Sequence, residues 1–352
     1  MPLSRMQQTA ALGADFWNDS CARRELEEAA LHGAVGATSN PVIVHAAVEG
    51  DRARWMPVLD RFIADHPEDT EDDIAWRLVA ALARDAAAVL APVHEVTGGR
   101  KGYVCVQVSP KLYRSARAMI EHGTSLATLA PNVAIKCPTT REGIAAMEEL
   151  TAAGINVNAT VSFTVPQAVA VADAIERGLD RALGAGAAPE RLHPYVTIMI
   201  GRLDDHMARV VDRDGIAIDR EHLGWAGIAA FKEARRIFAA RGYRSTLLAA
   251  AYRHERHWSE LIGDGVIQSI PYTWWTRFNA SGATPERTLE TPVDAAIVDA
   301  LLRAIPDFRR AYEVDGMRPE EFAGYGASVA TLRQFLGGYQ QLVELVRERM
   351  LG

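Results

Sequence analysis

The stretch that decides the fold reads VAIKCPTTREGIAAMEELTAAGINVNATV and covers residues 133–161. It begins with the apolar run Val133–Cys137, which has the length of a buried strand. Either Thr139 or Thr140 then caps a predicted helix over Glu142–Ala153, and Gly154 ends that helix. A second apolar run follows at Ile155–Val161. Strand, helix and strand in this order form the repeating unit of a parallel α/β fold.

The same alternation extends along the chain, in which we count eight strand-like runs separated by helical patterns. They are Ala14–Trp17, Ala34–Thr38, Tyr103–Val108, Val133–Cys137, Ile155–Val161, Pro194–Ile200, Thr246–Ala251 and Val266–Ile270. Eight such units predict a (β/α)8 barrel, or TIM barrel. A doubly wound open sheet is the alternative, but no complete G-x-G-x-x-G fingerprint follows a strand. We therefore predict a single barrel domain over residues 1–352.

Segments outside this repeat predict additional helices. The segment between the second and third strands is too long for one crossover and predicts helices within about residues 51–97. A long helix is expected at His222–Arg241, and the aromatic segment Tyr272–Phe278 is predicted to be a loop. A C-terminal helical extension is expected within about residues 292–350, with helices at Pro292–Tyr312 and Ser328–Met350.

Composition and charge narrow the class of function. The 352 residues are 49% hydrophobic and 24% charged, which is typical of a soluble globular protein. A net charge of −7 argues against a general nucleic-acid binder or a protein of anionic membranes. The three cysteines show no C-x-x-C spacing, and the N-terminus lacks the apolar core of a signal peptide. No apolar stretch is long enough to cross a membrane, so a cytoplasmic protein is expected.

Lys136 is one of only four lysines, and it is the only one embedded in an apolar strand. Burying an ammonium group is costly, so such a lysine either pairs with a carboxylate or becomes neutral. A neutral, desolvated lysine attacks carbonyl groups and can form a Schiff base. The pattern alone leaves both interpretations open: a catalytic nucleophile, or a buried stem whose head pairs with a carboxylate at a strand end.

In a barrel of this kind, polar residues at the carboxyl ends of the strands face the active site. Candidates at or near these ends are Asp15, Thr38, Ser39, Asn40, Gln107, Ser109, Lys136, Asn158, Thr160, Ser162, Arg202 and Arg253. Asp15 is the natural proton shuttle for aldol chemistry, with a helix cap or an ion-pair partner as the alternative. Arg202 and Arg253 can clamp a phosphate, although arginine is abundant here and each also fits a surface role.

Metal and hydrolase motifs are weak. His254 and His257 are three residues apart, but the stretch HERH is not H-E-x-x-H, so a zinc site is not expected. The run Asp204-Asp205-His206 is more typical of a solvated helix start than of a metal site. No G-x-S-x-G nucleophile elbow is present.

Together, three of these segments resemble the transaldolase family. Residues 36–41 (GATSNP) resemble its second-strand T-[ST]-N-P motif, and residues 133–144 resemble its Schiff-base segment. Residues 154–163, followed by Gln167 and Ala168, resemble its fifth-strand signature. The resemblance covers about residues 14–271, and the C-terminal helices match more loosely.

The resemblance implies a reaction and roles for the candidates. Lys136 attacks the ketose carbonyl of fructose 6-phosphate or sedoheptulose 7-phosphate, and Asp15 takes the proton of the C4 hydroxyl. An enamine then holds a dihydroxyacetone unit until an aldose phosphate accepts it, with Thr160 holding the catalytic water.

The remaining site residues are implied to bind substrate. Asn40 and Asn158 are expected to bind the sugar hydroxyls, with Thr38 and Ser162 beside them. Arg202 and Arg253 are expected to bind the phosphate. No metal or organic cofactor is implied, because the protonated imine is the electron sink. The family includes monomers, dimers and larger rings, so a homodimer is one assembly that the resemblance allows.

Three departures from the family pattern bear on the substrate. Gln107 stands where transaldolases carry glutamate, whereas the related fructose 6-phosphate aldolases carry glutamine there. Ala251 stands where a serine in the family helps to hold the phosphate. The sixth strand reads HPYVTIMIGR instead of S-P-[FY]-V-x-R, and Tyr195 is taken as its aromatic, substrate-binding residue. A fructose 6-phosphate aldolase or a specialised transaldolase of secondary metabolism is therefore the alternative. A non-catalytic barrel that binds sugar phosphates is the alternative from another class.

Overall fold

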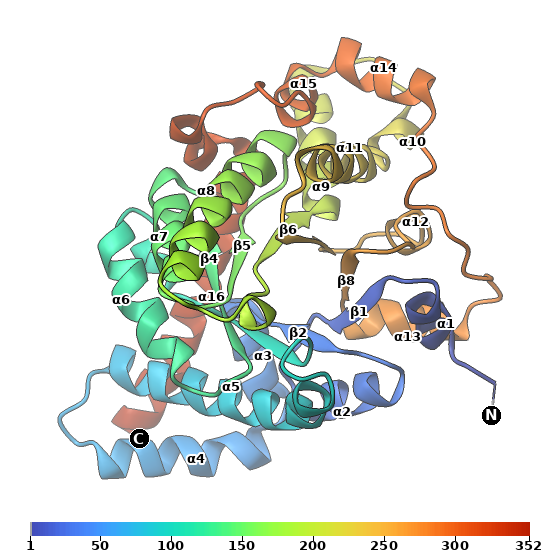
Figure 1. Ribbon diagram of the computed structural model, residues 1–352. Helices are drawn as coiled ribbons and strands as arrows, with labels where there is room; N and C mark the ends of the chain where they lie inside the picture. The colour runs from blue at the N-terminus through green and yellow to red at the C-terminus, as the bar shows by residue number, and fades with distance from the viewer. Residues whose placement is uncertain (1) are drawn as a thin grey trace.

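The computed structural model describes residues 2–352, and in this part of the chain eight parallel strands close into a barrel (Figure 1). Each strand pairs with the next one in the chain, and β8 pairs with β1. The strands are β1 (Asp15–Asn18), β2 (Gly36–Thr38), β3 (Tyr103–Gln107), β4 (Val133–Pro138), β5 (Val157–Thr160), β6 (Tyr195–Met199), β7 (Thr246–Ala250) and β8 (Val266–Ile270). The predicted (β/α)8 barrel is confirmed.

Helices surround the barrel. They are α1 (Arg5–Ala11), α2 (Arg23–Leu31), α3 (Pro41–Gly50), α4 (Arg52–Asp65), α5 (Glu71–Val96), α6 (Ala116–Ala127), α7 (Arg141–Ala152), α8 (Val165–Gly184), α9 (Ile200–Asp214), α10 (Arg220–Leu223), α11 (Ala226–Arg241), α12 (Arg256–Ser259), α13 (Tyr272–Ala280), α14 (Ala295–Ala304), α15 (Pro306–Tyr312) and α16 (Gly326–Leu351). Short 3-10 turns lie at Pro110–Leu112, Pro189–Arg191 and Pro319–Gly324.

Two predicted helices are each divided into two. The predicted helix at Pro292–Tyr312 breaks between α14 and α15 because Pro306 follows Ile305, whose backbone is extended. The predicted helix at His222–Arg241 breaks between α10 and α11, where Gly224 and Trp225 leave the helix.

The aromatic segment Tyr272–Phe278 is not a loop, because it forms most of helix α13. Trp275 and Phe278 are three residues apart and therefore lie on one face of this helix, where both are buried. Phe278 stacks on Trp258 at a centroid distance of 4.7 Å. Aromatic packing thus selects the helix over the loop that we predicted.

The interior of the barrel is filled below the level of Lys136. Trp17, Tyr103 and Tyr195 pack into one buried cluster, and the rings of Trp17 and Tyr195 meet edge to face at 4.9 Å. Gly36 makes room for this layer, because a Cβ atom there would lie 2.2 Å from the Trp17 ring. The filled interior leaves the carboxyl ends of the strands as the place for a site.

The C-terminal helix α16 lies beside the barrel and packs against α3 and α5 (Figure 1). Gly338 allows the close approach to α3, because a Cβ atom there would lie 3.0 Å from the backbone of Val42. The Tyr339 hydroxyl also donates to Asp72 at the start of α5, at 2.6 Å. The end of the chain is therefore held against the segment that follows β2.

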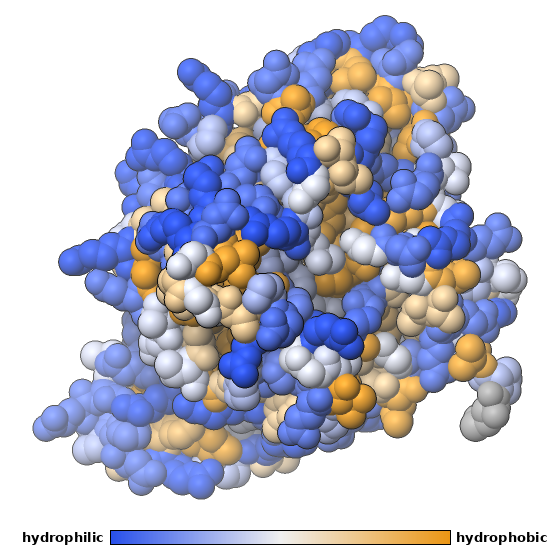
Figure 2. All heavy atoms as spheres, in the orientation of Figure 1, coloured by the Kyte–Doolittle hydropathy of each residue, from blue (hydrophilic) through white to orange (hydrophobic). Residues whose placement is uncertain are grey.

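One face of the molecule is mostly polar. On the face in Figure 2, charged and polar side chains are interspersed with small apolar patches. None of the helices within residues 2–352 combines the length and the hydropathy that a bilayer-spanning helix requires.

Candidate active site

A cavity of about 250 Å³ opens at the carboxyl ends of the strands, around Lys136. It brings together five of the predicted site residues: Thr38, Asn40, Lys136, Arg202 and Arg253. It also contains Ala251, which the sequence comparison singled out, and residues that the sequence did not lead us to select: Asp19, Val42, Ile43, Thr197, Met199, Leu248, Ala250, Pro271 and Gln334.

Lys136 lies on β4 and is only 4% exposed. Its Nζ atom donates a hydrogen bond to the backbone carbonyl of Ser39 at 3.1 Å. Burial lowers the pKa of the Lys136 amine, and the nearby Asp19 carboxylate partly offsets this effect. A lowered pKa increases the fraction of neutral amine, which is the form that attacks carbonyl groups.

The predicted position of Asp15 is wrong, because Asp15 begins β1 instead of ending it. Its carboxylate pairs with Lys101 at 2.6 Å, and it is not among the residues that line the Lys136 cavity. Asp19, which follows β1, supplies the carboxylate of that cavity. Successive side chains along a strand point to opposite sides, so Asp15, Trp17 and Asp19 point to the same side of the chain. Asp19 lies four residues after Asp15 and therefore at the carboxyl end of β1.

Asp19 is held by a short network of hydroxyl groups. Thr38 Oγ1 donates to Asp19 Oδ1 at 2.5 Å and lies 2.7 Å from the Ser269 hydroxyl. Burial raises the pKa of the Asp19 carboxyl, whereas the charge of Lys136 and the Thr38 hydrogen bond lower it. A carboxyl group with a raised pKa, held in the same cavity as a buried amine, is suited to exchange protons with a ligand.

Gln107 and Asn158 flank Lys136 on the two neighbouring strands, since both are in register with it. Asn158 is fully buried, accepts a hydrogen bond from Thr197 Oγ1 at 2.8 Å and donates to Cys105 Sγ at 3.3 Å. Gln107 is also buried, and its Oε1 atom has no hydrogen-bond partner within residues 2–352. Neither Gln107 nor Asn158 is among the residues that line the Lys136 cavity.

Thr160 and Ser162 continue β5 beyond Asn158, and both are buried. Thr160 Oγ1 lies 3.9 Å from the sulfur of Met199, which lines the Lys136 cavity. The Ser162 hydroxyl has no hydrogen-bond partner in the described part of the chain. Neither side chain is among those that line the cavity, so both lie behind its wall.

The aromatic position of the sixth-strand motif was predicted at Tyr195, and the structure places Tyr195 elsewhere. Tyr195 begins β6 and packs within the barrel against Trp17, away from the cavity. In the motif S-P-[FY]-V-x-R, the aromatic residue precedes the arginine by three positions. Met199, which precedes Arg202 by three positions, lines the cavity instead of Tyr195.

Asn40 has a structural role in addition to its place in the cavity. It is the N-cap of α3, and its Oδ1 atom accepts hydrogen bonds from the backbone of Val42 and Ile43 at 3.0 and 3.1 Å. The cap fixes the Asn40 carbonyl oxygen and turns its side-chain NH2 group away from the helix. The same residue can therefore begin the helix and donate to a ligand.

Arg202 and Arg253 form the cationic end of the cavity. Burial lowers the pKa of Arg202 to about 10, and the charge of Arg253 contributes in the same direction. Arg253 is more exposed and pairs with Asp205 at 2.8 Å. Two guanidinium groups that repel each other favour a dianion such as a phosphate between them.

A buried network fixes the Arg253 loop. His257 Nδ1 accepts the backbone N–H of Arg253 at 3.0 Å, and His257 Nε2 lies 2.8 Å from Asp204 Oδ2. Because Nδ1 accepts, Nε2 carries the proton of the neutral ring and donates to Asp204. Asp204, His254 and His257 lie close enough to resemble a metal site, but a protonated Nε2 is a hydrogen-bond donor and not a ligand.

Two residues that directly follow strands have a strained backbone. Val161 and Ala251 have φ angles of 53° and 66°, which residues other than glycine rarely adopt. Val161 follows Thr160, and Ala251 lines the cavity directly after β7. Such strain concentrates at functional sites, where the surrounding structure maintains it.

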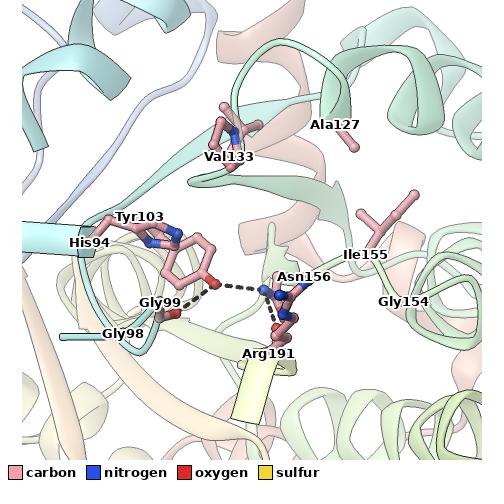
Figure 3. A pocket seen from close by; sticks show the side chains of 11 residues that line it. His94, Gly98, Gly99, Tyr103, Ala127, Val133, Gly154, Ile155, Asn156 and Arg191 are labelled. Atoms are coloured by element: carbon pink, nitrogen blue, oxygen red, sulfur yellow. Dashed lines mark hydrogen bonds between the residues drawn. The ribbon is translucent and has the colours of Figure 1, made fainter. Parts of the chain in front are cut away.

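A larger cavity of about 460 Å³ lies at the opposite end of the barrel (Figure 3). Tyr103, Val133 and Asn156 line it, and they lie at the amino ends of their strands. The Tyr103 hydroxyl donates to the Gly99 carbonyl and accepts from Asn156, as the dashed lines in Figure 3 show. This end of a barrel supports stability instead of catalysis, so the smaller cavity around Lys136 is the candidate active site.

The fold and the cavity define the class: a (β/α)8-barrel protein with a buried lysine, a carboxyl group and an arginine pair at the carboxyl ends of its strands. Residues 16–315 match the family described as Transaldolase/Fructose-6-phosphate aldolase. The chain belongs to this family, and the predicted family and enzyme class are confirmed.

Curated transaldolases are similar in sequence to this chain over most of their length. A transaldolase of Thiobacillus denitrificans is 33% identical over 321 residues, which cover 82% of this chain and 88% of the relative. Transaldolase 1 of Streptomyces coelicolor is 30% identical over 300 residues, or 76% of each chain. A transaldolase of Acidothermus cellulolyticus is 28% identical over 338 residues and covers 93% of this chain.

Proposed function

We propose that this enzyme transfers a dihydroxyacetone unit from a ketose phosphate to an aldose phosphate through a Schiff base on Lys136. One observation carries the proposal. A buried lysine amine with a lowered pKa lines the same cavity as a carboxyl group and two arginines. Fructose 6-phosphate and sedoheptulose 7-phosphate are the proposed donors.

The first step uses the neutral amine of Lys136. Its nitrogen adds to the C2 carbonyl carbon of the ketose, and loss of water then gives a protonated imine. The Ser39 carbonyl, which accepts from Nζ at 3.1 Å, orients the amine for this attack. The positive imine becomes the electron sink of the next step, so the proposed chemistry needs no organic cofactor.

Asp19 is the proposed base for carbon–carbon cleavage. Its carboxylate takes the proton of the C4 hydroxyl while the C3–C4 bond breaks and its electrons move toward the imine. The aldose phosphate leaves, and an enamine remains on Lys136. The enamine then attacks the acceptor aldehyde, and Asp19 returns the proton to the new hydroxyl. Thr38, which donates to Asp19, holds the carboxylate during both transfers.

The remaining site residues are proposed to bind the rest of the substrate. Asn40, Asn158 and Ser162 are proposed to bind hydroxyls of the dihydroxyacetone unit, and of these three residues only Asn40 lines the cavity in the described part of the chain. Thr160 is proposed to hold the water that hydrolyses the imine. Arg202 and Arg253 are proposed to hold the phosphate, for which Arg253 exchanges its contact with Asp205.

Gln107 favours a second candidate, an aldolase that releases free dihydroxyacetone. An amide cannot exchange a proton as a glutamate does, so the handling of water beside Lys136 changes. The resemblance also associates glutamine at this position with fructose 6-phosphate aldolases. A homodimer, a single domain, a cytoplasmic location and the absence of a metal stay predictions.

Product analysis tests the proposal and separates the two candidates. Fructose 6-phosphate is incubated with and without erythrose 4-phosphate, and the products are measured by mass spectrometry. Sedoheptulose 7-phosphate that forms only with the acceptor supports transfer, whereas dihydroxyacetone formed without it identifies the aldolase. If neither product forms, both candidate functions are contradicted.

A matched pair of variants tests the carboxyl assignment. Asp19→Asn is expected to reduce turnover by about 100-fold or more, since general acid–base catalysis contributes about 10²–10⁴. Asp15→Asn, which removes the partner of Lys101 at the other end of β1, is expected to keep turnover close to that of the native enzyme. The reverse ranking would restore Asp15 to the catalytic role.

A further inference from the structure

Helix α16 presents one face to Arg202. Thr331, Gln334 and Phe335 have the spacing that places side chains on the same side of a helix. Gln334 Oε1 accepts a hydrogen bond from Arg202 Nη1 at 2.5 Å, and the Thr331 hydroxyl lies 3.4 Å from the same nitrogen. The Arg202 guanidinium also lies over the Phe335 ring, 5.7 Å from its centroid. The C-terminal helix therefore positions one of the two arginines of the cavity.

Gln334 is itself part of the cavity wall. An arginine can only donate hydrogen bonds, so the atom of the Gln334 amide that faces Arg202 must be the oxygen. Because its oxygen accepts from Arg202, the side-chain NH2 group of Gln334 remains as a hydrogen-bond donor. Gln334 is thus a neutral donor next to a cationic one, with its orientation set by Arg202.

The cavity needs such a donor. Ala251 lines the phosphate end next to Arg253, at the position where the family pattern has a serine hydroxyl. Alanine cannot donate, so a phosphate bound between the two arginines would lose one hydrogen bond from β7. A donor from another element can replace it.

We propose that Gln334 of the C-terminal helix binds the substrate phosphate together with Arg202 and Arg253, in place of the hydroxyl that Ala251 lacks. The inference rests on the proposed function, because it assigns the phosphate of a sugar phosphate to this end of the cavity. The helix that carries Gln334 is held firmly, since Gly338 packs on Val42 and Ser328 accepts from Gln167 at 3.3 Å.

Three variants of the full-length enzyme test this role. Gln334→Ala removes the donor, and Gln334→Glu keeps an oxygen for Arg202 but replaces the donor with a negative charge. Gln341→Ala, at an exposed position of the same helix, is the matched control. The dissociation constant of inorganic phosphate, measured by calorimetry, is expected to rise about tenfold in Gln334→Ala and more in Gln334→Glu, since a hydrogen bond to a charged group contributes that much. The control is expected to bind phosphate as the native enzyme does.

Kinetics separate a ligand contact from a structural role. The KM for fructose 6-phosphate is expected to rise in both Gln334 variants, with little change in the rate of imine trapping by unphosphorylated dihydroxyacetone. Adding Ala251→Ser to Gln334→Ala is expected to recover part of the loss, because it restores a hydroxyl near Arg253. Equal losses with both compounds, or unchanged phosphate binding in Gln334→Ala, would overturn the inference.

The outcomes also separate this inference from the proposed function. Phosphate binding that depends on Gln334, in an enzyme that forms no adduct on Lys136, would support the inference and contradict the Schiff-base proposal. Adduct formation on Lys136, together with phosphate binding that does not change when Gln334 is replaced, would support the Schiff-base proposal and contradict the inference.

Discussion

Lys136 depends on its surroundings for its reactivity. At an exposed position the same side chain would carry a hydrated ammonium group, whereas burial on β4 lowers its pKa. Asp19 acts in the opposite direction, because its negative charge stabilises the protonated amine. The two effects together set the pH at which the amine becomes a nucleophile.

The pH dependence of imine formation follows from these two effects. The rate falls as pH falls through the pKa of Lys136, because the protonated amine cannot attack. Asp19→Asn removes a charge that raises this pKa, so the acidic limb of the profile is expected to move to lower pH. Single-turnover trapping of dihydroxyacetone on the enzyme measures the profile without requiring cleavage. A limb that stays in place or moves to higher pH would contradict the coupling between Asp19 and Lys136.

Sequence reasoning identified Lys136 because a lysine in an apolar strand is unusual, but it placed the carboxylate four residues too early. The run Ala14–Trp17 is apolar except at Asp15, which made Asp15 the visible acid. Asp19 was not selected, because it lies outside this apolar run, although the rule that sites follow the strand ends points to it. Gln334 gave no local signal, since only the fold brings residue 334 to the carboxyl end of the barrel.

At the scale of elements, aromatic packing and proline explain where sequence patterns failed. Trp275 and Phe278 turn the expected loop after β8 into helix α13 by burying one helical face. Pro306 divides the expected helix before residue 312. The strands were predicted more closely because apolar runs between turn residues define them directly.

Two adjacent glycines test how α16 is held. Gly338→Ala places a Cβ atom 2.6 Å from Val42 Cγ2 and 3.0 Å from its backbone, so the helices must separate. We expect a loss of about 1–3 kcal/mol in the free energy of unfolding, as for other overpacked sites. Gly337→Ala meets no atom within 4 Å in the described part of the chain and is expected to stabilise the helix by about 1 kcal/mol. Chemical denaturation measures both, and equal effects of the two substitutions would contradict the packing of α16 on α3.

At the scale of the molecule, the chain folds back so that its last helix lies at the cavity that residues from β1 to β8 form. Helix α16 packs on α3, which Asn40 caps, and also supplies Gln334 to the cavity. The eightfold alternation of the sequence predicts the barrel but contains no information on where the extension packs. That packing depends on contacts between residues about 300 positions apart, which local patterns do not encode.

Deletion of the last helix tests its contribution to the whole fold. Helix α16 buries Leu332, Phe335, Tyr339, Leu342 and Val346. Burial of each large apolar side chain contributes about 1.5–3 kcal/mol, so the sum is comparable with the usual 5–15 kcal/mol stability of a protein. An enzyme without residues 326–352 is expected to lose its cooperative thermal unfolding transition, measured by circular dichroism. Removal of only Leu351 and Gly352, which are exposed, is the control, and an unchanged transition after the longer deletion would contradict this role.

Borohydride trapping tests the central claim most directly. The enzyme is incubated with fructose 6-phosphate, reduced with borohydride and digested, and its peptides are analysed by mass spectrometry beside an authentic transaldolase. The account predicts one stable dihydroxyacetone adduct, on the peptide that contains Lys136, and none in Lys136→Met. An adduct on Lys101, Lys111 or Lys232, or no adduct while the reference enzyme is labelled, would contradict it.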